Sequence, residues 1–154
     1  MKQIFITVTF FLLGISVFGQ TKMKQSSLYF EFSYRCELLS SNYDSKRDFQ
    51  SYIYTDSIND IVVIIDVKKK TYLEDGDKEF IDNMVFDYGN IKATTGYFCG
   101  IYALITDGKE NDGSTFKSVT LYKSKRAYIV TILSSFSESV KKAYKQIEET
   151  FVFK

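Results

Sequence analysis

Two segments with helical spacing interrupt a chain that otherwise consists of β-rich runs. Apolar residues recur every three or four positions from Phe80 to Tyr88, and Asp75 or Asp77 is placed to cap the first turn. The second segment, from Phe136 to Glu149, carries an apolar stripe opposite a face of lysines and glutamates. The pattern therefore predicts an α+β fold with two helices.

The β-rich runs predict the strands of this fold. Runs 49–55 and 61–67 lie on either side of a short Asp/Asn/Ser segment and predict a hairpin. The polar stretch 40–48 before them predicts a loop. Further strands are expected at 28–34, 91–106, 115–123, 127–133 and 151–153.

Two of the predicted strands are apolar on both faces. They are Ile61–Ile65 and Tyr128–Leu133, and strands of this kind are typical of a sheet that is covered on both sides. Together with the two helices, they predict an antiparallel sheet covered by helices on both faces, which is an α/β/α sandwich.

The first nineteen residues have the three parts of a secretory signal peptide. Lys2 provides the positive charge, a largely apolar run extends from Ile4 to Leu13, and the small residue Gly19 precedes Gln20 at the expected cleavage site. The run is shorter than the roughly 20 apolar residues of a membrane-spanning helix, and no cysteine lies near the junction to carry a lipid anchor.

We therefore expect residues 1–19 to be removed, with a retained N-terminal anchor as the alternative. Residues 20–154 are expected to form a single domain that works in the periplasm or outside the cell. The mature chain is predicted to have neither a membrane span nor a lipid anchor.

Histidine, tryptophan and proline are absent from all 154 residues. Without histidine, Ser-His-Asp and Cys-His nucleophilic sites and nearly all ordinary zinc sites are excluded. The formal net charge of +1 argues against a broad electrostatic attraction to nucleic acid. An enzyme of this composition would depend on carboxylates or tyrosines, and no motif selects such a set, so we predict that the protein is not an enzyme.

Cys36 and Cys99 are the only cysteines. An even count in an oxidising compartment is compatible with a disulfide, which would close a loop of about sixty residues and stabilise the fold by a few kcal/mol. Both cysteines also lie in strand-like contexts, so two buried thiols are the alternative.

Two acidic stretches contain oxygen ligands that suit calcium. Acidic residues such as those in Glu74–Glu79 are also favoured in the first turn of a helix by its dipole. Asp107–Gly113 has the composition of a hairpin loop. Neither stretch has the spacing of an EF-hand loop, so we predict no metal site and no cofactor.

Four features occur in a characteristic order along the mature chain. They are Ile53–Asp56 before the hairpin, the first helix, Gly100–Leu104 in a long strand, and the closing stretches Lys125–Thr131 and Glu149–Phe153. In this order they resemble the PsbP-like fold family, which includes the extrinsic photosystem II subunit, a nuclear Ran-binding protein and many exported bacterial proteins of unknown role. Tyr34–Glu37 departs from the pattern, because the family has a proline-rich entry to the first strand there. The resemblance implies an α/β/α sandwich that acts as a docking or accessory module, and it carries over no catalytic residue.

The leading functional hypothesis is a non-enzymatic binding or accessory module that docks on another envelope protein. Tyrosine is enriched at protein interfaces, so exposed tyrosines would serve as anchors. The candidates are Tyr29, Tyr34, Tyr43, Tyr52, Tyr54, Tyr72, Tyr97, Tyr102 and Tyr122.

Two other functions are compatible with the sequence. A small-ligand carrier would need an apolar cavity of at least about 300 Å³ between the sheet and a helix. A carboxylate-based hydrolase would need two acidic groups about 5–10 Å apart in a cleft, one of them with a strongly raised pKa.

Overall fold

The computed structural model describes residues 22–154, so the predicted signal peptide and its cleavage site between Gly19 and Gln20 lie outside the described residues. The strands are β1 (Lys24–Ser26), β2 (Phe30–Ser33), β3 (Glu37–Asp44), β4 (Phe49–Asp56), β5 (Ile61–Lys69), β6 (Phe86–Tyr88), β7 (Ile91–Phe98), β8 (Ile101–Lys109), β9 (Thr115–Lys123), β10 (Arg126–Ser134) and β11 (Val152–Phe153). The helices are α1 (Lys78–Asp82) and α2 (Ser137–Thr150). No helix within residues 22–154 has the length and apolar character needed to cross a membrane.

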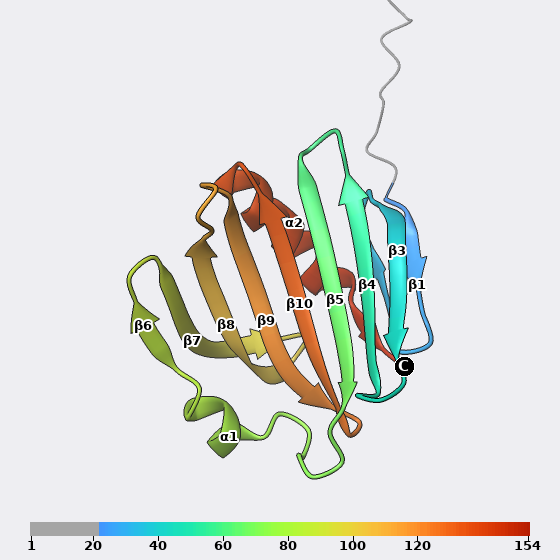
Figure 1. The fold of residues 1–154 in the computed structure, drawn as a ribbon, viewed down its shortest axis with the longest axis vertical. Coiled ribbons are helices and arrows are strands. Elements are labelled where there is room, and N and C mark those ends of the chain that lie inside the picture. Colours follow the sequence, from blue (N-terminus) through green and yellow to red (C-terminus); the bar gives the residue numbers. More distant parts are fainter. Residues whose placement is uncertain (1–21) are drawn as a thin grey trace, which may run out of the picture.

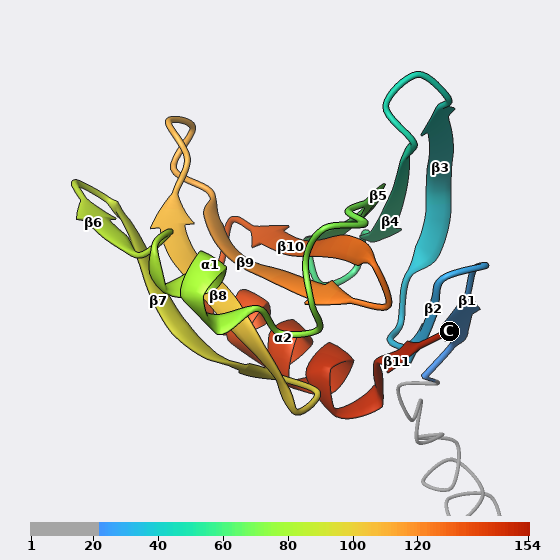
Figure 2. The same ribbon diagram turned by 90° about the horizontal axis from the view of Figure 1, so that it is seen from below.

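Eight strands form one antiparallel sheet in the order β3-β4-β5-β10-β9-β8-β7-β6. A smaller sheet, β1-β2-β11, lies together with α2 on one side of the large sheet (Figures 1 and 2). We call the side of the large sheet that faces α2 the inner face and the opposite side the outer face. The sheet is curved, and the outer face is its concave side (Figure 2).

The strand register directs an unbroken set of apolar side chains to the inner face. Tyr54 of β4 lies opposite Val63 of β5, which lies opposite Ile132 of β10, and all three side chains are buried. Because side chains alternate between the two faces of a strand, the residues two positions along form the next buried row. That row includes Ile65 and Val130.

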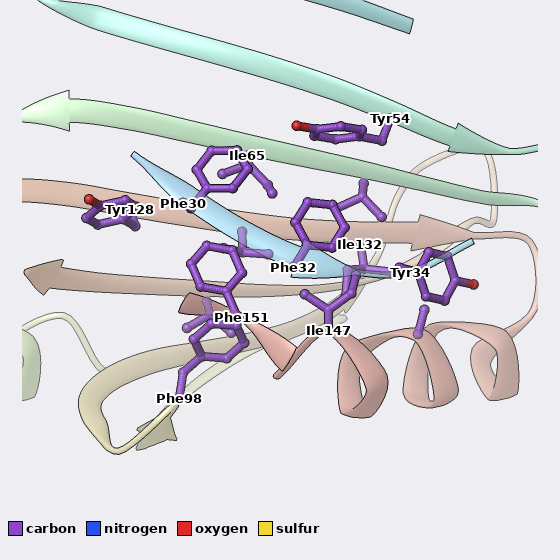
Figure 3. Packing of buried hydrophobic residues seen from close by; sticks show 14 of the residues in the cluster. Phe30, Phe32, Tyr34, Tyr54, Ile65, Phe98, Tyr128, Ile132, Ile147 and Phe151 are labelled. Atoms are coloured by element: carbon purple, nitrogen blue, oxygen red, sulfur yellow. The ribbon is translucent and has the colours of Figure 1, made fainter. Parts of the chain in front are cut away.

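An aromatic cluster joins the two layers (Figure 3). Phe30 and Phe32 of β2 stack on Phe151 with ring centroids 5.5 and 6.2 Å away. Phe98 of β7 meets Phe151 edge-on at 5.4 Å, and Ile147 of α2 is fully buried in the same cluster. Burial of each such side chain contributes about 1.5–3 kcal/mol, so this cluster holds α2 and the small sheet on the inner face.

The outer face does not carry the helical layer that the sequence predicted. α1 has five residues and packs at one end of this face, where Ile81 joins a small cluster with Leu104 and Tyr122. Over the middle of the face the side chains are only partly covered, and Val62 is 36% exposed. The predicted α/β/α sandwich is therefore wrong, and the fold is a β-sandwich-like arrangement made mostly of antiparallel sheet. Strands with apolar residues on both faces do not require two covers, since roughly half or more of a folded protein's surface is apolar.

The first predicted helix is shorter than its spacing indicated. Asp77 caps α1 by accepting a hydrogen bond from the backbone N–H of Phe80, as predicted, but the helix ends at Asp82. Phe86–Tyr88 then forms β6, which pairs with the first three residues of β7. Strand pairing with β7 therefore overrides the helical spacing of this segment.

Two further local predictions are wrong. The predicted strand 91–106 is two strands, β7 and β8, joined by a tight turn at Cys99 and Gly100 with φ of 51° and 77°. The predicted loop 40–48 lies largely in the edge strand β3. The hairpin of β4 and β5, the second helix α2 and the closing strand β11 are confirmed.

Candidate functional site

Exposed aromatic residues belong to α1, β6 and β7 and to the segment before α1. Figure 1 shows these elements at one end of the large sheet. Tyr97 on β7 is 64% exposed and meets Tyr102 of β8 edge-on at a ring distance of 5.5 Å. Tyr88 on β6 is 83% exposed. The aromatic surface, as we call this set, consists of Tyr72, Phe80, Phe86, Tyr88 and Tyr97.

The strand β7 has a free edge beside the aromatic surface. β6 pairs only with Ile91–Ala93, so within residues 22–154 no strand pairs with the free edge of Thr94–Phe98. Phe98 and Ile101 flank the two-residue turn to β8, and residues in that position of a hairpin exchange both backbone hydrogen bonds. The alternation along the strand then directs the N–H and C=O groups of Thr95 and Tyr97 away from β8.

The opposite edge of the sheet is less regular. The edge strand β3 has a bulge between Leu38 and Ser40, and bulges are one way in which proteins prevent an edge from pairing with another strand. Thr94–Phe98 contains no bulge, no lysine and no proline. Of the two edges, that of β7 is therefore the better template for a further strand.

The tyrosines proposed from the sequence divide into three groups. Exposed members are Tyr43, Tyr72 and Tyr97; half-buried members are Tyr29 and Tyr102; buried members are Tyr34, Tyr52, Tyr54 and Tyr122. The buried members pack in the hydrophobic clusters of the core, so the role of their rings is structural. Burial also raises the pKa of Tyr34 to about 12. Sequence reasoning missed Phe86 and Tyr88, because it placed both in a helix.

A cavity of about 350 Å³ lies between the first turns of α2 and the ends of β7, β8 and β9. We call it the lysine cavity. Val140 of α2 is its buried apolar residue. Gly108 and Phe116 also border the cavity, but the ring of Phe116 lies on the outer face, where a Cβ on Gly108 would approach it within 2.7 Å. The remaining lining residues are Asn90, Lys92, Asp107, Lys109, Thr115, Lys117, Ser137 and Lys141.

Four lysines and one aspartate give the lysine cavity a positive charge. Lys117 points inward, with Nζ 2.9 and 3.1 Å from the two carboxylate oxygens of Asp107 and 4.8 Å from the ring centre of Tyr144. Lys141 and Lys92 form ion pairs with Glu138 and Asp87, which do not line the cavity, at 2.8 and 3.7 Å. Lys109 has no ion-pair partner within residues 22–154.

One local feature of the sequence indicates this cavity. Lys117, Val119 and Leu121 alternate along β9, so all three face inward once the strand is placed. A lysine at an inward position is unusual and indicates that the apolar core is interrupted there. Only the register shows that Asp107 and Lys92 lie in the same row.

A second, smaller cavity of about 150 Å³ lies on the other side of α2. Lys22, Arg35 and Lys142 line it together with Tyr34, Asn59, Ser139 and Gln146. Its size suits a few waters rather than an organic ligand.

Cys36 and Cys99 are free thiols in the structure. Cys36 is buried in the core and Cys99 donates a hydrogen bond to the backbone carbonyl of Glu148 at 3.0 Å. Burial raises the pKa of Cys36 to about 12 and that of Cys99 to about 11. A thiol with such a pKa is almost fully protonated at neutral pH and is a poor nucleophile.

The two acidic stretches serve structural roles. Asp75 accepts hydrogen bonds from Nζ of Lys123 and from the backbone N–H of Ser124, both at 2.6 Å. In the second stretch, Asp112 accepts from the backbone N–H and the hydroxyl of Ser114 at 2.9 and 2.6 Å. Within residues 22–154 no group of three or more potential ligands is placed to hold a metal ion.

Asp66 is the one titratable group with an unpartnered buried atom in the described part of the chain. Its Oδ1 has no hydrogen-bond partner, and burial raises the pKa of this carboxyl. By register, Asp66 lies on the outer face between Ser51 and Ile129. The other outer-face positions of β4, β5, β8, β9 and β10 hold no carboxylate, so the pair that a glycosidase mechanism requires is not assembled there.

Comparisons with known proteins do not place the chain in a family. No protein-family model matches it, and no curated protein matches it significantly. The resemblance to the PsbP-like family therefore rests on the motifs quoted above, and the function is inferred from the geometry of the chain itself.

Proposed function

We propose that this protein is a non-enzymatic, exported binding module that docks on another envelope protein through the free edge of β7. The observation that carries the proposal is the juxtaposition of an unpaired strand edge, Thr94–Phe98, with the exposed aromatic surface. In this proposal the partner contributes an extended segment that pairs with β7 as a ninth strand of the large sheet.

Strand addition supplies affinity and specificity from different groups. The partner's backbone bonds to the outward N–H and C=O groups of Thr95 and Tyr97, and pockets for its alternate side chains give selectivity. Tyrosine provides a large contact area at a low cost in conformational entropy, and Tyr97 is exposed on this edge, with the exposed Phe86 opposite Ala93 at its start.

The free edge also has a cost that a partner would remove. An exposed, regular strand edge invites pairing with other chains and aggregation unless charge, proline, a bulge or another segment protects it. Thr94–Phe98 has none of the first three. A partner that covers the edge therefore both uses and protects it.

A photo-crosslinking experiment tests this proposal with a matched control. A photoreactive phenylalanine analogue replaces either Tyr97 or Tyr43 in the full-length exported protein. These tyrosines are 64% and 58% exposed and lie near opposite edges of the same sheet, Tyr97 on the open part of β7 and Tyr43 on the edge strand β3. We expect one dominant adduct from position 97 and none from position 43, and equal adducts from both positions would contradict the proposal.

A second experiment tests strand addition itself once the adduct has been identified. Thr95→Pro removes the outward N–H group, and proline is tolerated at an edge whose N–H faces solvent. Thr95→Val keeps that N–H and serves as the control. We expect Thr95→Pro to weaken binding by at least about tenfold and Thr95→Val to bind as the wild type does. Equal binding by both variants would overturn the mode of docking.

A further inference from the structure

The smaller cavity beside α2, which we call the Tyr34 cavity, brings cationic side chains together without a carboxylate. Lys22, Arg35 and Lys142 are among its lining residues, and no aspartate or glutamate is. None of these three cations forms an ion pair within residues 22–154. Because the net charge of the whole chain is only +1, a hollow lined by three unpaired cations is unlike the average surface and would attract an anion.

Backbone hydrogen bonds hold two segments around this cavity. After β2, the N–H of Cys36 bonds to the carbonyl of Tyr34 at 3.0 Å, which closes a three-residue γ-turn around Arg35. The N–H of Tyr34 bonds to the carbonyl of Met23 at 3.1 Å, so the segment that carries Lys22 lies beside the turn. Local backbone structure therefore places Tyr34, Arg35 and Lys22 at one cavity.

α2 and the turn between β4 and β5 complete the wall. Ser139, Lys142 and Gln146 are three and four residues apart, so they share one face of the helix. Asn59 lies in the turn. The hydroxyl and amide groups of these residues add neutral hydrogen-bond donors to the cationic ones.

Asp56 is a carboxylate that could oppose an anion at this place, because its charge acts on Tyr34. One of its oxygens accepts hydrogen bonds from the backbone N–H groups of Ile58 and Asn59, and the other accepts from Nδ2 of Asn59 at 2.5 Å. The donors of the turn therefore meet the charge of Asp56, which does not line the cavity.

Tyr34 supplies the observation that points to a ligand. The residue is only 6% exposed and lines the cavity, and Figure 3 shows its hydroxyl directed away from the aromatic cluster. Within residues 22–154 this hydroxyl has no hydrogen-bond partner. Burial raises the pKa of Tyr34 to about 12, so the hydroxyl remains a donor at neutral pH. A donor on a buried residue is costly to leave without a partner, and a bound group removes that cost.

The size of the Tyr34 cavity limits the anion that it can hold. Its volume is about 150 Å³, and an engineered protein cavity of roughly that volume binds benzene. A tetrahedral oxyanion such as phosphate or sulfate has fewer non-hydrogen atoms than benzene. The half-buried Arg35 offers a planar fork of donors that fits two oxygens of such an anion, while a lysine acts as a point charge.

We propose that the Tyr34 cavity binds a free tetrahedral oxyanion, phosphate or sulfate, that is held by Arg35, Lys142 and the hydroxyl of Tyr34. This site shares no residue with the proposed docking edge Thr94–Phe98. Failure of one proposal therefore leaves the other standing.

Isothermal titration of the purified protein in phosphate-free buffer tests the proposal. The probes are sodium phosphate, sodium sulfate and sodium chloride at equal ionic strength. We expect saturable binding of phosphate or sulfate with a Kd below about 1 mM and no saturable binding of chloride. No saturable binding of either oxyanion would overturn the proposal, and so would an equal response to chloride. Vesicles of phosphatidic acid carry the phosphate group on a lipid, and binding to them without binding of inorganic phosphate would also overturn it.

Variants then locate the bound anion. Tyr34→Phe removes only the hydroxyl and should weaken oxyanion binding by at least about tenfold, because hydrogen bonds to charged groups are strong. Lys142→Gln removes one exposed charge and should weaken it by at least about threefold. Tyr52→Phe and Lys145→Gln are the matched controls, a buried tyrosine and an exposed lysine of α2 that do not line the cavity, and both should bind as the wild type does. Unchanged binding by Tyr34→Phe, or equal losses in the cavity variants and their controls, would contradict the assignment.

Discussion

The inner face of the large sheet has two unlike regions beneath the same helix. Under the C-terminal half of α2, aromatic rings from β2, β7 and the chain end pack around Phe151 and Ile147. Under its first turns, the corner formed by β7, β8 and β9 holds Lys117 and Asp107 instead, and the lysine cavity opens there. In both regions, side chains alternate in the same way between the inner and outer faces of the strands.

This difference shows that the hydrophobic core covers only part of the inner face of the large sheet. The row that contains Lys117 continues into β10 and β5 as Ile132 and Val63, which are fully buried. The change from apolar to charged therefore occurs between neighbouring strands within one row. We infer that the aromatic region provides most of the stability, and that the lysine corner is free to serve another purpose.

The largest effect that tests this comparison is expected in the aromatic region. Phe151→Ala removes the ring that contacts Phe30, Phe32, Phe98 and Phe153. We expect it to lower the free energy of unfolding by about 3–5 kcal/mol, measured by urea denaturation. Phe136→Ala, at a position that is 62% exposed, is the control and should change it by less than about 0.5 kcal/mol. Similar effects of the two substitutions would refute the division of the inner face.

Asp66 provides a second test, because within residues 22–154 its carboxyl group has no cationic partner, unlike that of Asp107. Burial raises the pKa of Asp66 in the folded state, so the folded protein holds this proton more tightly than the unfolded chain does. Stability from this group is therefore present below the ordinary pKa of about 4 and is lost as the pH rises through the raised value. Asp66→Asn should stabilise the protein at pH 7 by about 1–2 kcal/mol and much less at pH 3.5.

Urea unfolding of wild type and Asp66→Asn across pH 3.5–7 measures this difference. A gap between the two proteins that stays constant with pH would show that the carboxyl titrates normally. Asp112→Asn, whose carboxyl has a lowered pKa because Ser114 donates hydrogen bonds to it, is the control and should give a pH dependence of opposite sign.

A smaller effect is expected at the lysine corner. Lys117→Met keeps the aliphatic stem but removes the ion pair with Asp107 and the contact with the Tyr144 ring. The Lys117 side chain is 20% exposed and that of Asp107 is 57% exposed, so we expect a loss of about 0.5–1 kcal/mol that shrinks at high salt. Lys141→Met, whose ion pair is fully at the surface, is the control. A loss as large as that of Phe151→Ala would show that the corner is part of the core.

The smallest effect concerns reactivity rather than stability. With pKa values of about 11 for Cys99 and about 12 for Cys36, both thiols should react slowly with a disulfide reagent at pH 8. Cys99 is half-buried and should react first, whereas Cys36 should wait for unfolding. Two equivalents of reactive thiol after denaturation without reductant are expected, and none would show a Cys36–Cys99 disulfide.

Sequence patterns predicted correctly those elements whose own residues favour the structure that they adopt in the fold. The β4–β5 hairpin follows from two β-rich runs around a polar turn, and α2 follows from its apolar stripe. The prediction failed at 80–88, where helical spacing competes with strand pairing to β7, and at Cys99–Gly100, where a tight turn lies inside a continuous β-rich run. In both cases the structure of the segment depends on its pairing with a neighbouring strand rather than on its own residues.

The candidate sites were less accessible to sequence reasoning than the elements. Tyr97 was among the tyrosines proposed as anchors, but the free edge beside it exists only because β6 stops after three residues. Lys92, Asp107 and Lys117 are far apart in the chain and meet through register. Lys117 has a local signal, its inward place in the alternation with Val119 and Leu121 along β9, but Lys92 and Asp107 have none.

The sequence by itself determined the small set of possible chemistries and most of the strands. Without histidine the chain has no ordinary nucleophilic triad, and its alternating apolar residues specify which side chains of each strand share a face. Only the tertiary structure decided which face α2 covers, where the core gives way to lysines, and which strand edge stays open. These outcomes depend on contacts between distant segments, and such contacts are set by the packing of the whole chain rather than by any single run of residues.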